Sequence, residues 1–234
     1  MTPGRLEKFL KRLAPELGGG PLYVYVPKDS EPIPPATESY LGCTGRRMDL
    51  TLRPLLSEWR GRGPAIALNT SAIRQEAKGL ADGLGWTEAA TFGWRCAMTA
   101  IHELGHVLAD GPPPYFDAVE RPPLTFAEVV RHFSAPPSRF ARSMPSWWGH
   151  SMHSWGRIVL HLRHRAEALG MYCPATVLID WRRFGLSSPA CYVDRLGDEP
   201  ERMAGATFED IKATPAPDAF SELWRMDTGP ADDD

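Results

Sequence analysis

The segment from about Thr87 to Ala109 constrains the fold more strongly than any other part of the 234-residue chain. When successive residues are placed about 100° apart, as in an α-helix, the large apolar side chains of this segment fall on one arc. They are Trp94, Ala97, Met98, Ile101, Leu104 and Leu108. A helix with such an arc packs into a core along much of its length, so we expect the rest of the chain to be built around it.

Prolines restrict the regular structure that can surround this helix. The chain contains 23 of them, about twice the usual share, and they predict loops over residues 28–48 and 111–123. Two short apolar runs, Leu22–Val26 and Pro64–Asn69, are typical of buried strands. We therefore expect short strands that are separated by long ordered loops.

Shorter helical patterns occur on both sides of the central helix. They cover residues 5–14, roughly sixteen residues ending at Gly170, Ser188 to Gly197, and Ala219 to Trp224. The length is sufficient for one hydrophobic core, and we find neither an internal repeat nor a strong domain boundary. The sequence therefore predicts a single domain over residues 1–234, with a C-terminal helical extension over about residues 171–234.

Charge, hydropathy and cysteine usage limit the partners and the compartment. A net charge of −3 and a pI near 6.2 provide no general attraction to nucleic acids or anionic membranes. No stretch approaches the roughly 18 apolar residues of a membrane helix, and the first residues lack the apolar run of a signal peptide. The four cysteines are widely spaced, and we interpret them as reduced thiols: Cys43, Cys96, Cys173 and Cys191. These features predict a cytoplasmic protein.

Residues 102–106 read His-Glu-Leu-Gly-His and lie within the predicted long helix. Side chains four positions apart on a helix project from nearly the same face, so His102 and His106 can bind one ion at about 2.0–2.1 Å. Glu103 is about 100° from His102, which makes it a poor third ligand but places it to accept a proton from a metal-activated water. The pattern predicts a zinc site with His102 and His106 as ligands and Glu103 as the general base.

The position of this motif on the helix favours a metal site over a pair of solvent-facing histidines. The two histidines are about 40° apart on the flank of the apolar arc, where the edge of a core cleft is expected. The spacing arises by chance in on the order of one chain per hundred of this length. Gly105 costs the helix about 1 kcal/mol relative to alanine, which is easier to explain if something approaches the helix closely there.

The segment His102–His106 resembles the active-site helix of the zincin metallopeptidases. The resemblance implies a helix-rich α+β fold with a small sheet and an active-site helix beneath it. It also implies that an extended peptide binds by strand addition to an edge strand above the cleft, and we expect Ala65–Asn69 to be that strand. The metzincin subclass is excluded, because its glycine and third histidine are replaced here by Ala109 and Pro112.

The third zinc ligand has three candidates. Glu128 matches the gluzincin type, in which a later helix provides a glutamate, but its capping-box spacing from Thr125 explains it without a metal. The segment Trp148–Arg157 is similar to one in SprT-like and related minimal zincins, where a histidine precedes an aromatic residue at the start of a helix. It offers His150 and His153. We favour His150, because it precedes the expected helix and is free to turn toward the cleft.

The helix that ends at Gly170 carries a polar stripe, which we interpret as a solvated face. It consists of His153, Arg157, His161 and His164, opposite Trp155, Ile158, Leu162 and Leu169. A solvated stripe turns His153 away from the core and makes His161 a surface histidine, with a transition-state donor as the alternative. Asp110 is a candidate for orienting His106, and Arg157 and Tyr115 are candidates for stabilising an oxyanion.

These features together predict metal-assisted hydrolysis of a peptide or protein substrate, with Zn²⁺ as the cofactor and no nucleic-acid partner. A competing hypothesis is a metal-binding regulatory or interaction protein that retains the zincin helix and acts on a single partner. It arises because His102–His106 also resembles the helix of intracellular peptidases that cleave phage or stress-response repressors. The chain has no basic patch or zinc ribbon of the kind expected in a DNA-associated SprT-like protease.

Overall fold

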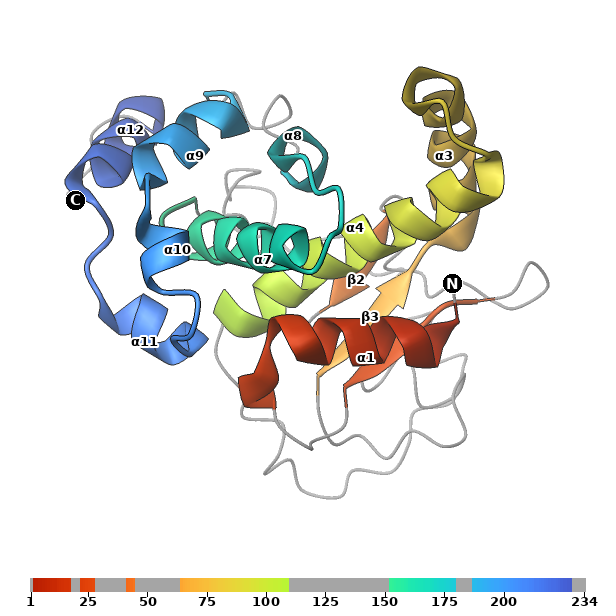
Figure 1. Cartoon of the computed structure of the whole chain (residues 1–234), viewed down its shortest axis with the longest axis horizontal. Helices are drawn as coiled ribbons and strands as arrows, with labels where there is room; N and C mark the ends of the chain where they lie inside the picture. The colour runs from red at the N-terminus through yellow and green to blue at the C-terminus, as the bar shows by residue number, and fades with distance from the viewer. Residues whose placement is uncertain are drawn as a thin grey trace, which may run out of the picture.

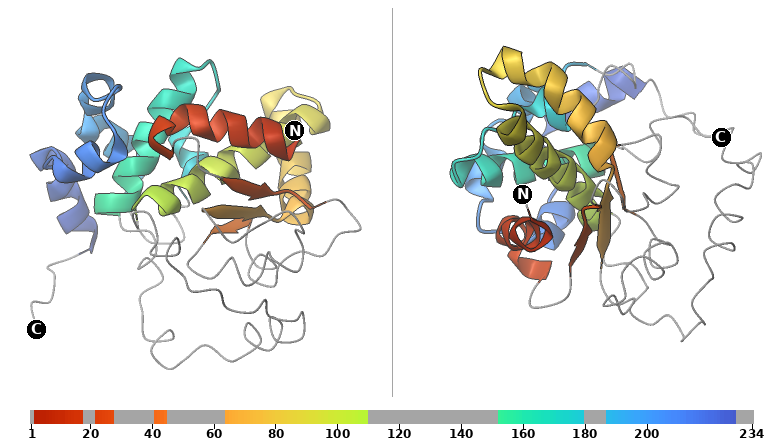
Figure 2. Two further views of the ribbon diagram at one scale, coloured as in Figure 1. Left: turned by 90° about the horizontal axis from the view of Figure 1, so that it is seen from below. Right: turned by 90° about the vertical axis from the view of Figure 1, so that its right-hand side faces the viewer.

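The longest helix in the described part of this computed structural model is α4 (Glu88–Ala109), as the hydrophobic arc predicts. The structure describes residues 2–17, 22–27, 41–44, 64–109, 152–179 and 187–228. All six residues of the predicted arc are buried, and α4 contacts strands β2 and β3 as well as helices on both sides. Figures 1 and 2 show α4 between a small sheet and helix α7. The described residues thus form a helix-rich α+β fold around α4.

The sheet has three strands in the order β1-β3-β2, formed by β1 (Tyr23–Tyr25), β2 (Gly42–Thr44) and β3 (Ala65–Leu68). β1 is parallel to β3, and β2 is antiparallel to it, with Cys43 opposite Ala67. The expectation that Ala65–Asn69 is an edge strand is therefore wrong, because β3 is central. All four residues of β3 are buried, and such an unbroken apolar run is typical of a strand with neighbours on both sides.

Strand β2 lies within residues 28–48, where a loop was expected, so that prediction is wrong at Gly42–Thr44. Its close approach to α4 requires Gly42, because a Cβ atom there would lie 2.8 Å from Thr99 Cγ2 and 3.2 Å from Glu103 Cγ. The hydroxyl of Thr44 donates a hydrogen bond to the carbonyl of Ala65 at 2.6 Å. Among the described strands, β2 is therefore the antiparallel edge strand, and it lies against the motif-bearing part of α4.

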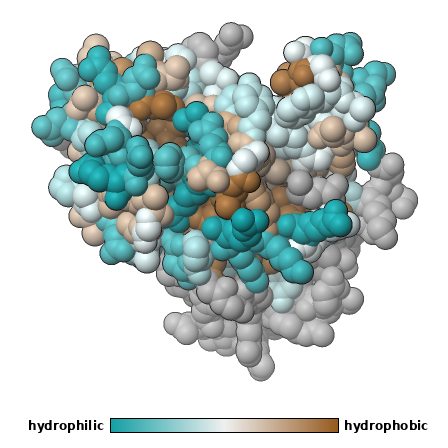
Figure 3. Space-filling model, viewed as in Figure 1, coloured by the Kyte–Doolittle hydropathy of each residue, from teal (hydrophilic) through white to brown (hydrophobic). Residues whose placement is uncertain are grey.

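Two further helices, α1 and α3, pack against α4. α1 (Pro3–Leu13), followed by the short turn η1 (Pro15–Leu17), buries Leu6, Leu10 and Leu13, and Figure 3 shows hydrophilic residues along its outer face. Helix α3 (Thr70–Leu84) was not anticipated. The side chain of Asn69 accepts a hydrogen bond from Ala72 N–H at 3.0 Å at its start, and Gly85 ends it with a φ of 66°.

All the regular elements among the described residues after 151 are helices. A π-helical turn, η4 (Met152–Gly156), leads into α7 (Arg157–Ala168), which ends before Gly170 with a φ of 81°, as predicted. After it come α8 (Ala175–Leu178), α9 (Pro189–Leu196), α10 (Glu199–Arg202), α11 (Phe208–Ala213) and α12 (Asp218–Thr228). The predicted Ser188 start and Gly197 stop of α9 are both confirmed. Figure 1 shows α9 to α12 gathered at the end of the molecule opposite α3.

The C-terminal helices are tied to the N-terminal helix and to the end of α4 by side chain to backbone hydrogen bonds. The guanidinium of Arg165 donates to Leu13 O at 2.8 Å, and the backbone N–H of Phe208 donates to Glu16 at 2.6 Å. Lys212 donates to Leu108 O at 3.1 Å, at the C-terminal end of α4. Residues from opposite ends of the chain therefore stabilise one structure.

The polar stripe on α7 is not a solvated face, so that prediction is wrong for Arg157 and His161. Both side chains are buried, and they donate to the same oxygen of buried Glu199 on α10, at 2.8 Å and 2.6 Å. Burial lowers the pKa of His161. Burial by itself would raise the pKa of Glu199, but the hydrogen bonds from His161 and Arg157 outweigh it, so the pKa of Glu199 is lowered. Arg157 also donates to the carbonyls of Thr214 and Pro215. This network joins α7 to the C-terminal helices.

Among the described residues, no helix is both long and apolar enough to cross a membrane. The thiols of Cys96, Cys173 and Cys191 are free, which agrees with their interpretation as reduced cysteines. Burial raises the pKa of Cys96 to about 11 and is the main cause that raises the pKa of Cys173 to about 12. The two buried thiols are therefore protonated and unreactive at neutral pH.

Candidate metal centre

The rings of His102 and His106 lie side by side on α4, with centroids 5.2 Å apart and an angle of 67° between their planes. Both residues are half-buried, while their neighbours Ile101 and Leu104 are fully buried. Two imidazoles that bind one tetrahedral ion at about 2.0–2.1 Å have ring centroids roughly 5 Å apart. The observed separation therefore fits a shared ion, at the edge of the core where the helical wheel predicted the pair.

A backbone carbonyl fixes the tautomer of His102. Its Nδ1 lies 2.7 Å from Leu178 O at the end of α8. Because a carbonyl oxygen can only accept, Nδ1 carries the proton and Nε2 carries the lone pair. A histidine that donates one ring N–H to a carbonyl and directs the other nitrogen to a metal is the usual arrangement in metalloproteins. A backbone acceptor leaves no signal in the sequence, so only the fold reveals this contact.

Glu103 lies on the side of the histidine pair that faces β2. Its side chain is 6% exposed, and its carboxylate accepts a hydrogen bond from the backbone of Thr44. Burial raises the pKa of Glu103 to about 8, and the hydrogen bond from Thr44 opposes this rise. At that pKa the carboxyl group of the metal-free chain is mostly protonated at neutral pH, and a cation bound beside it would favour the carboxylate that a general base requires.

The indole of Trp155, in η4, flanks the pair on the side away from Glu103. It stacks on His106 with centroids 5.0 Å apart and planes 21° apart, and its edge contacts His102 at 4.7 Å and 66°. The expectation that something approaches Gly105 closely is confirmed, because a Cβ atom there would lie 2.3 Å from Val159 Cγ2 and 3.0 Å from Trp155 Nε1. The helical wheel places Trp155 opposite the polar stripe, but no sequence pattern indicates that it contacts the histidine pair.

None of the three candidates for the third ligand is among the described side chains. His150 and Glu128 lie outside them, as do Asp110 and Tyr115, and the side chain of His153 is not described either. Within the described ranges, no group of three His, Cys, Asp or Glu residues is arranged to hold a metal ion. The assignment of His150 therefore stays a prediction.

Arg157, a candidate for stabilising an oxyanion, lies away from the histidine pair in the network with Glu199. All three nitrogens of the Arg157 guanidinium donate within the network of Glu199, Thr214 and Pro215, so this side chain is not positioned to stabilise an oxyanion.

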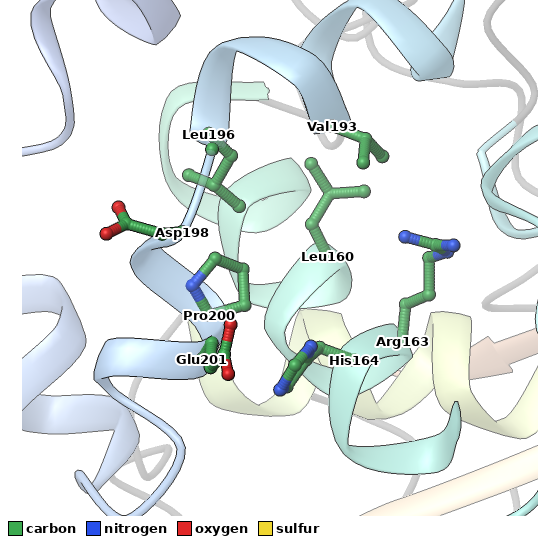
Figure 4. A pocket seen from close by; sticks show the side chains of 9 residues that line it. Leu160, Arg163, His164, Val193, Leu196, Asp198, Pro200 and Glu201 are labelled. Atoms are coloured by element: carbon green, nitrogen blue, oxygen red, sulfur yellow. The ribbon is translucent and has the colours of Figure 1, made fainter. Parts of the chain in front are cut away.

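A separate pocket of about 130 Å³ lies between α7, α9 and α10 (Figure 4). It shares no residue with the histidine pair, and its lining combines Leu160, Val193, Leu196 and Pro200 with Arg163, His164, Asp198 and Glu201.

No protein-family model matches this chain, and neither does any curated protein or solved structure. The resemblance to zincins therefore rests on residues 102–106 and on the geometry around them. The case for a function has to be made from the chemistry of this site.

Proposed function

We propose that this protein is a zinc-dependent hydrolase of peptide bonds, in which His102, His106 and His150 bind the metal and Glu103 is the general base. The observation that carries the proposal is the arrangement on α4. Two imidazoles lie at the separation that a shared tetrahedral ion requires, and Glu103, the residue after the first histidine on the same helix, is buried against β2. A pair of structural histidines on an amphipathic helix needs neither feature.

The donor set fits zinc in particular. Neutral imidazole nitrogens are preferred ligands of Zn²⁺, and the hydrogen bond from Nδ1 of His102 to Leu178 O supports the neutral tautomer that a ligand needs. Hard cations such as Mg²⁺ and Ca²⁺ prefer oxygen ligands instead. With two nitrogen ligands on one helical turn, a third protein ligand completes a catalytic site that keeps one position open.

The proposed mechanism assigns one task to each residue. When bound, zinc acts as a Lewis acid toward the substrate carbonyl and makes water more acidic. Glu103 takes a proton from the attacking water, and the water oxygen forms a bond to the carbonyl carbon. As the C–N bond breaks, Glu103 returns the proton to the leaving nitrogen, which departs as an amine. The carboxyl group is thereby restored to its starting state.

Strand β2 is the best candidate for substrate binding. It pairs with β3 on one side, and its backbone contacts Glu103 through Thr44. A peptide that adds to the outer edge of β2 would run past the general base in an extended conformation. This replaces the earlier assignment of Ala65–Asn69, because β3 already has a partner strand on each edge.

The contacts of Trp155 support a third ligand from the segment just before it. Because this indole touches both metal-binding rings, a residue a few positions before it in the chain is within reach of the pair. His153 precedes Trp155 by two residues and His150 by five, and five residues of extended chain span at most roughly 18 Å. We propose His150 as the ligand, with His153 and Glu128 as the alternatives that the experiment below separates.

Metal content tests the first half of the proposal. Protein purified without added metal should contain about one zinc per chain by elemental analysis. His102→Ala and His106→Ala should abolish this, and among His150→Ala, His153→Ala and Glu128→Ala only the first should do so. A wild-type protein that takes up no zinc on titration would refute the proposed site.

Glu103→Gln tests the second half. The variant should keep its zinc but lose about 10²–10⁴-fold of its hydrolytic rate on a peptide library, because the amide cannot accept the proton. Glu88→Gln, on the exposed first turn of the same helix, is the matched control and should leave the rate unchanged. Zinc binding by a wild-type protein that hydrolyses no peptide would instead favour a metal-binding regulatory protein with a single partner.

A further inference from the structure

We propose that Trp155 is a positioning residue of the metal site, whose indole holds the rings of His102 and His106 in the orientation that binds zinc. This inference rests on the proposed function, since it assigns a role within the same site. The observation behind it is that one buried side chain, 2% exposed, contacts both rings of the pair.

The two contacts differ in geometry and so restrain different motions. The indole is nearly parallel to His106, with planes 21° apart, and therefore fixes the plane of that ring. It meets His102 at 66°, in an edge contact at a centroid distance of 4.7 Å. Rotation of a histidine ring about χ2 is soft, so a ligand pair without such packing must be ordered when the metal binds. Packing that orders the rings beforehand removes this cost.

Trp155 is itself held from three directions. Its Nε1–H donates to the carbonyl of His102 at 3.4 Å, and the missing side chain of Gly105 leaves the space that the indole occupies. Two residues further along, Arg157 is bound to Glu199 at 2.8 Å, which ties the start of α7 to α10. The indole is therefore anchored both to the active-site helix and to the C-terminal helices, as a positioning group requires.

The test compares zinc affinity in Trp155→Leu and Trp155→Phe, measured by competition with a chromophoric chelator. Loss of a packing partner of the ligands should weaken zinc binding by about 10–100-fold in Trp155→Leu, the range found when groups behind metal ligands are removed. Trp155→Phe keeps an aromatic ring and should bind zinc within a few-fold of wild type. The visible absorption of the Co²⁺-loaded proteins should show altered coordination in the leucine variant alone.

Phe220→Leu is the matched control for a merely structural role. Phe220 is also fully buried and aromatic, but its ring packs against Tyr192 at 5.5 Å in the C-terminal helices. This variant should lose stability while its zinc affinity stays that of wild type. If Trp155→Leu does not fold, Trp155→Met, which fills the space without a ring, takes its place and should show the same loss.

Unchanged zinc affinity in Trp155→Leu or its methionine substitute overturns the inference, and so does equal loss in the phenylalanine variant. A wild-type protein without zinc affinity would instead overturn the proposed function. The two failures are therefore distinguishable.

Discussion

Replacing Gly105 with alanine tests how tightly α7 packs on α4. The new Cβ atom would lie 2.3 Å from Val159 Cγ2, whereas carbon atoms in contact are about 3.5–4.0 Å apart. The overlap is therefore at least about 1.2 Å. Val159 is fully buried and cannot turn into open space, so α7 or α4 has to move.

The magnitude follows from two opposing terms. Alanine gains about 1 kcal/mol over glycine inside a helix, while overpacking of a core costs about 1–3 kcal/mol. Because the overlap is large, we take the upper end and expect a net loss of about 2 kcal/mol. For a chain of this length, that lowers the midpoint of thermal unfolding by about 4–8 °C, which circular dichroism measures directly.

Gly93→Ala is the control on the same helix, because a Cβ atom there would meet none of the described residues within 4 Å. It should raise stability by up to about 1 kcal/mol. In the double variant Gly105→Ala with Val159→Ala, the removed methyl groups should relieve the overlap and give a coupling energy above about 1 kcal/mol. A Gly105→Ala protein that is as stable as Gly93→Ala would refute the reasoning.

The remaining predictions concern the free energy of unfolding, which denaturant titration measures. Glu199→Ala should cost about 3–5 kcal/mol, because it leaves the buried Arg157 cation without its carboxylate. Burial lowers the pKa of His161 below 6.5, so the unfolded chain binds this proton more tightly than the folded one. Stability should therefore fall as the pH drops below about 6.5. His161→Gln should flatten this slope by up to about 1.4 kcal/mol per pH unit. An unchanged slope would mean that His161 has the same pKa in the folded and the unfolded chain. Gly79→Ala, on the exposed face of α3, should add up to about 1 kcal/mol, and Asn69→Ala should remove about 1 kcal/mol with the cap of that helix.

Long periodic patterns were predictable from the sequence, and short or small-residue elements were not. The arc on α4 repeats over 22 residues, so its burial and the position of His102 and His106 on its flank could be read in advance. The buried stripe of α3 is Ile73, Ala77 and Ala81, whose small side chains give a weak apolar signal. Strand β2 has three residues, one of them Gly42, which is too few to show any alternation.

The contacts that shape the candidate site join residues far apart in the chain, and no local sequence pattern predicts such contacts. A helical wheel assigns charged residues to solvent, so it misplaced Arg157 and His161, whose partner Glu199 lies 42 and 38 residues further on. Trp155 reaches His102 across 53 residues, and Leu178 reaches it across 76. Which neighbours surround a residue depends on how the helices pack, and that is decided by the whole chain.

The hydrogen bonds between the two ends of the molecule have a consequence for biosynthesis. Glu16 accepts from Phe208 across 192 residues, and Leu108 accepts from Lys212 across 104. At about 5–20 residues per second, a ribosome needs roughly 10–40 s to make the chain between the first pair. For part of that interval, the surfaces of α1 and α4 that pack against α7 in the finished protein lack this partner, because α7 is made after both helices. We expect nascent chains that end before about residue 208 to be sensitive to protease and to recruit chaperones, with protection gained only after the last helices leave the exit tunnel.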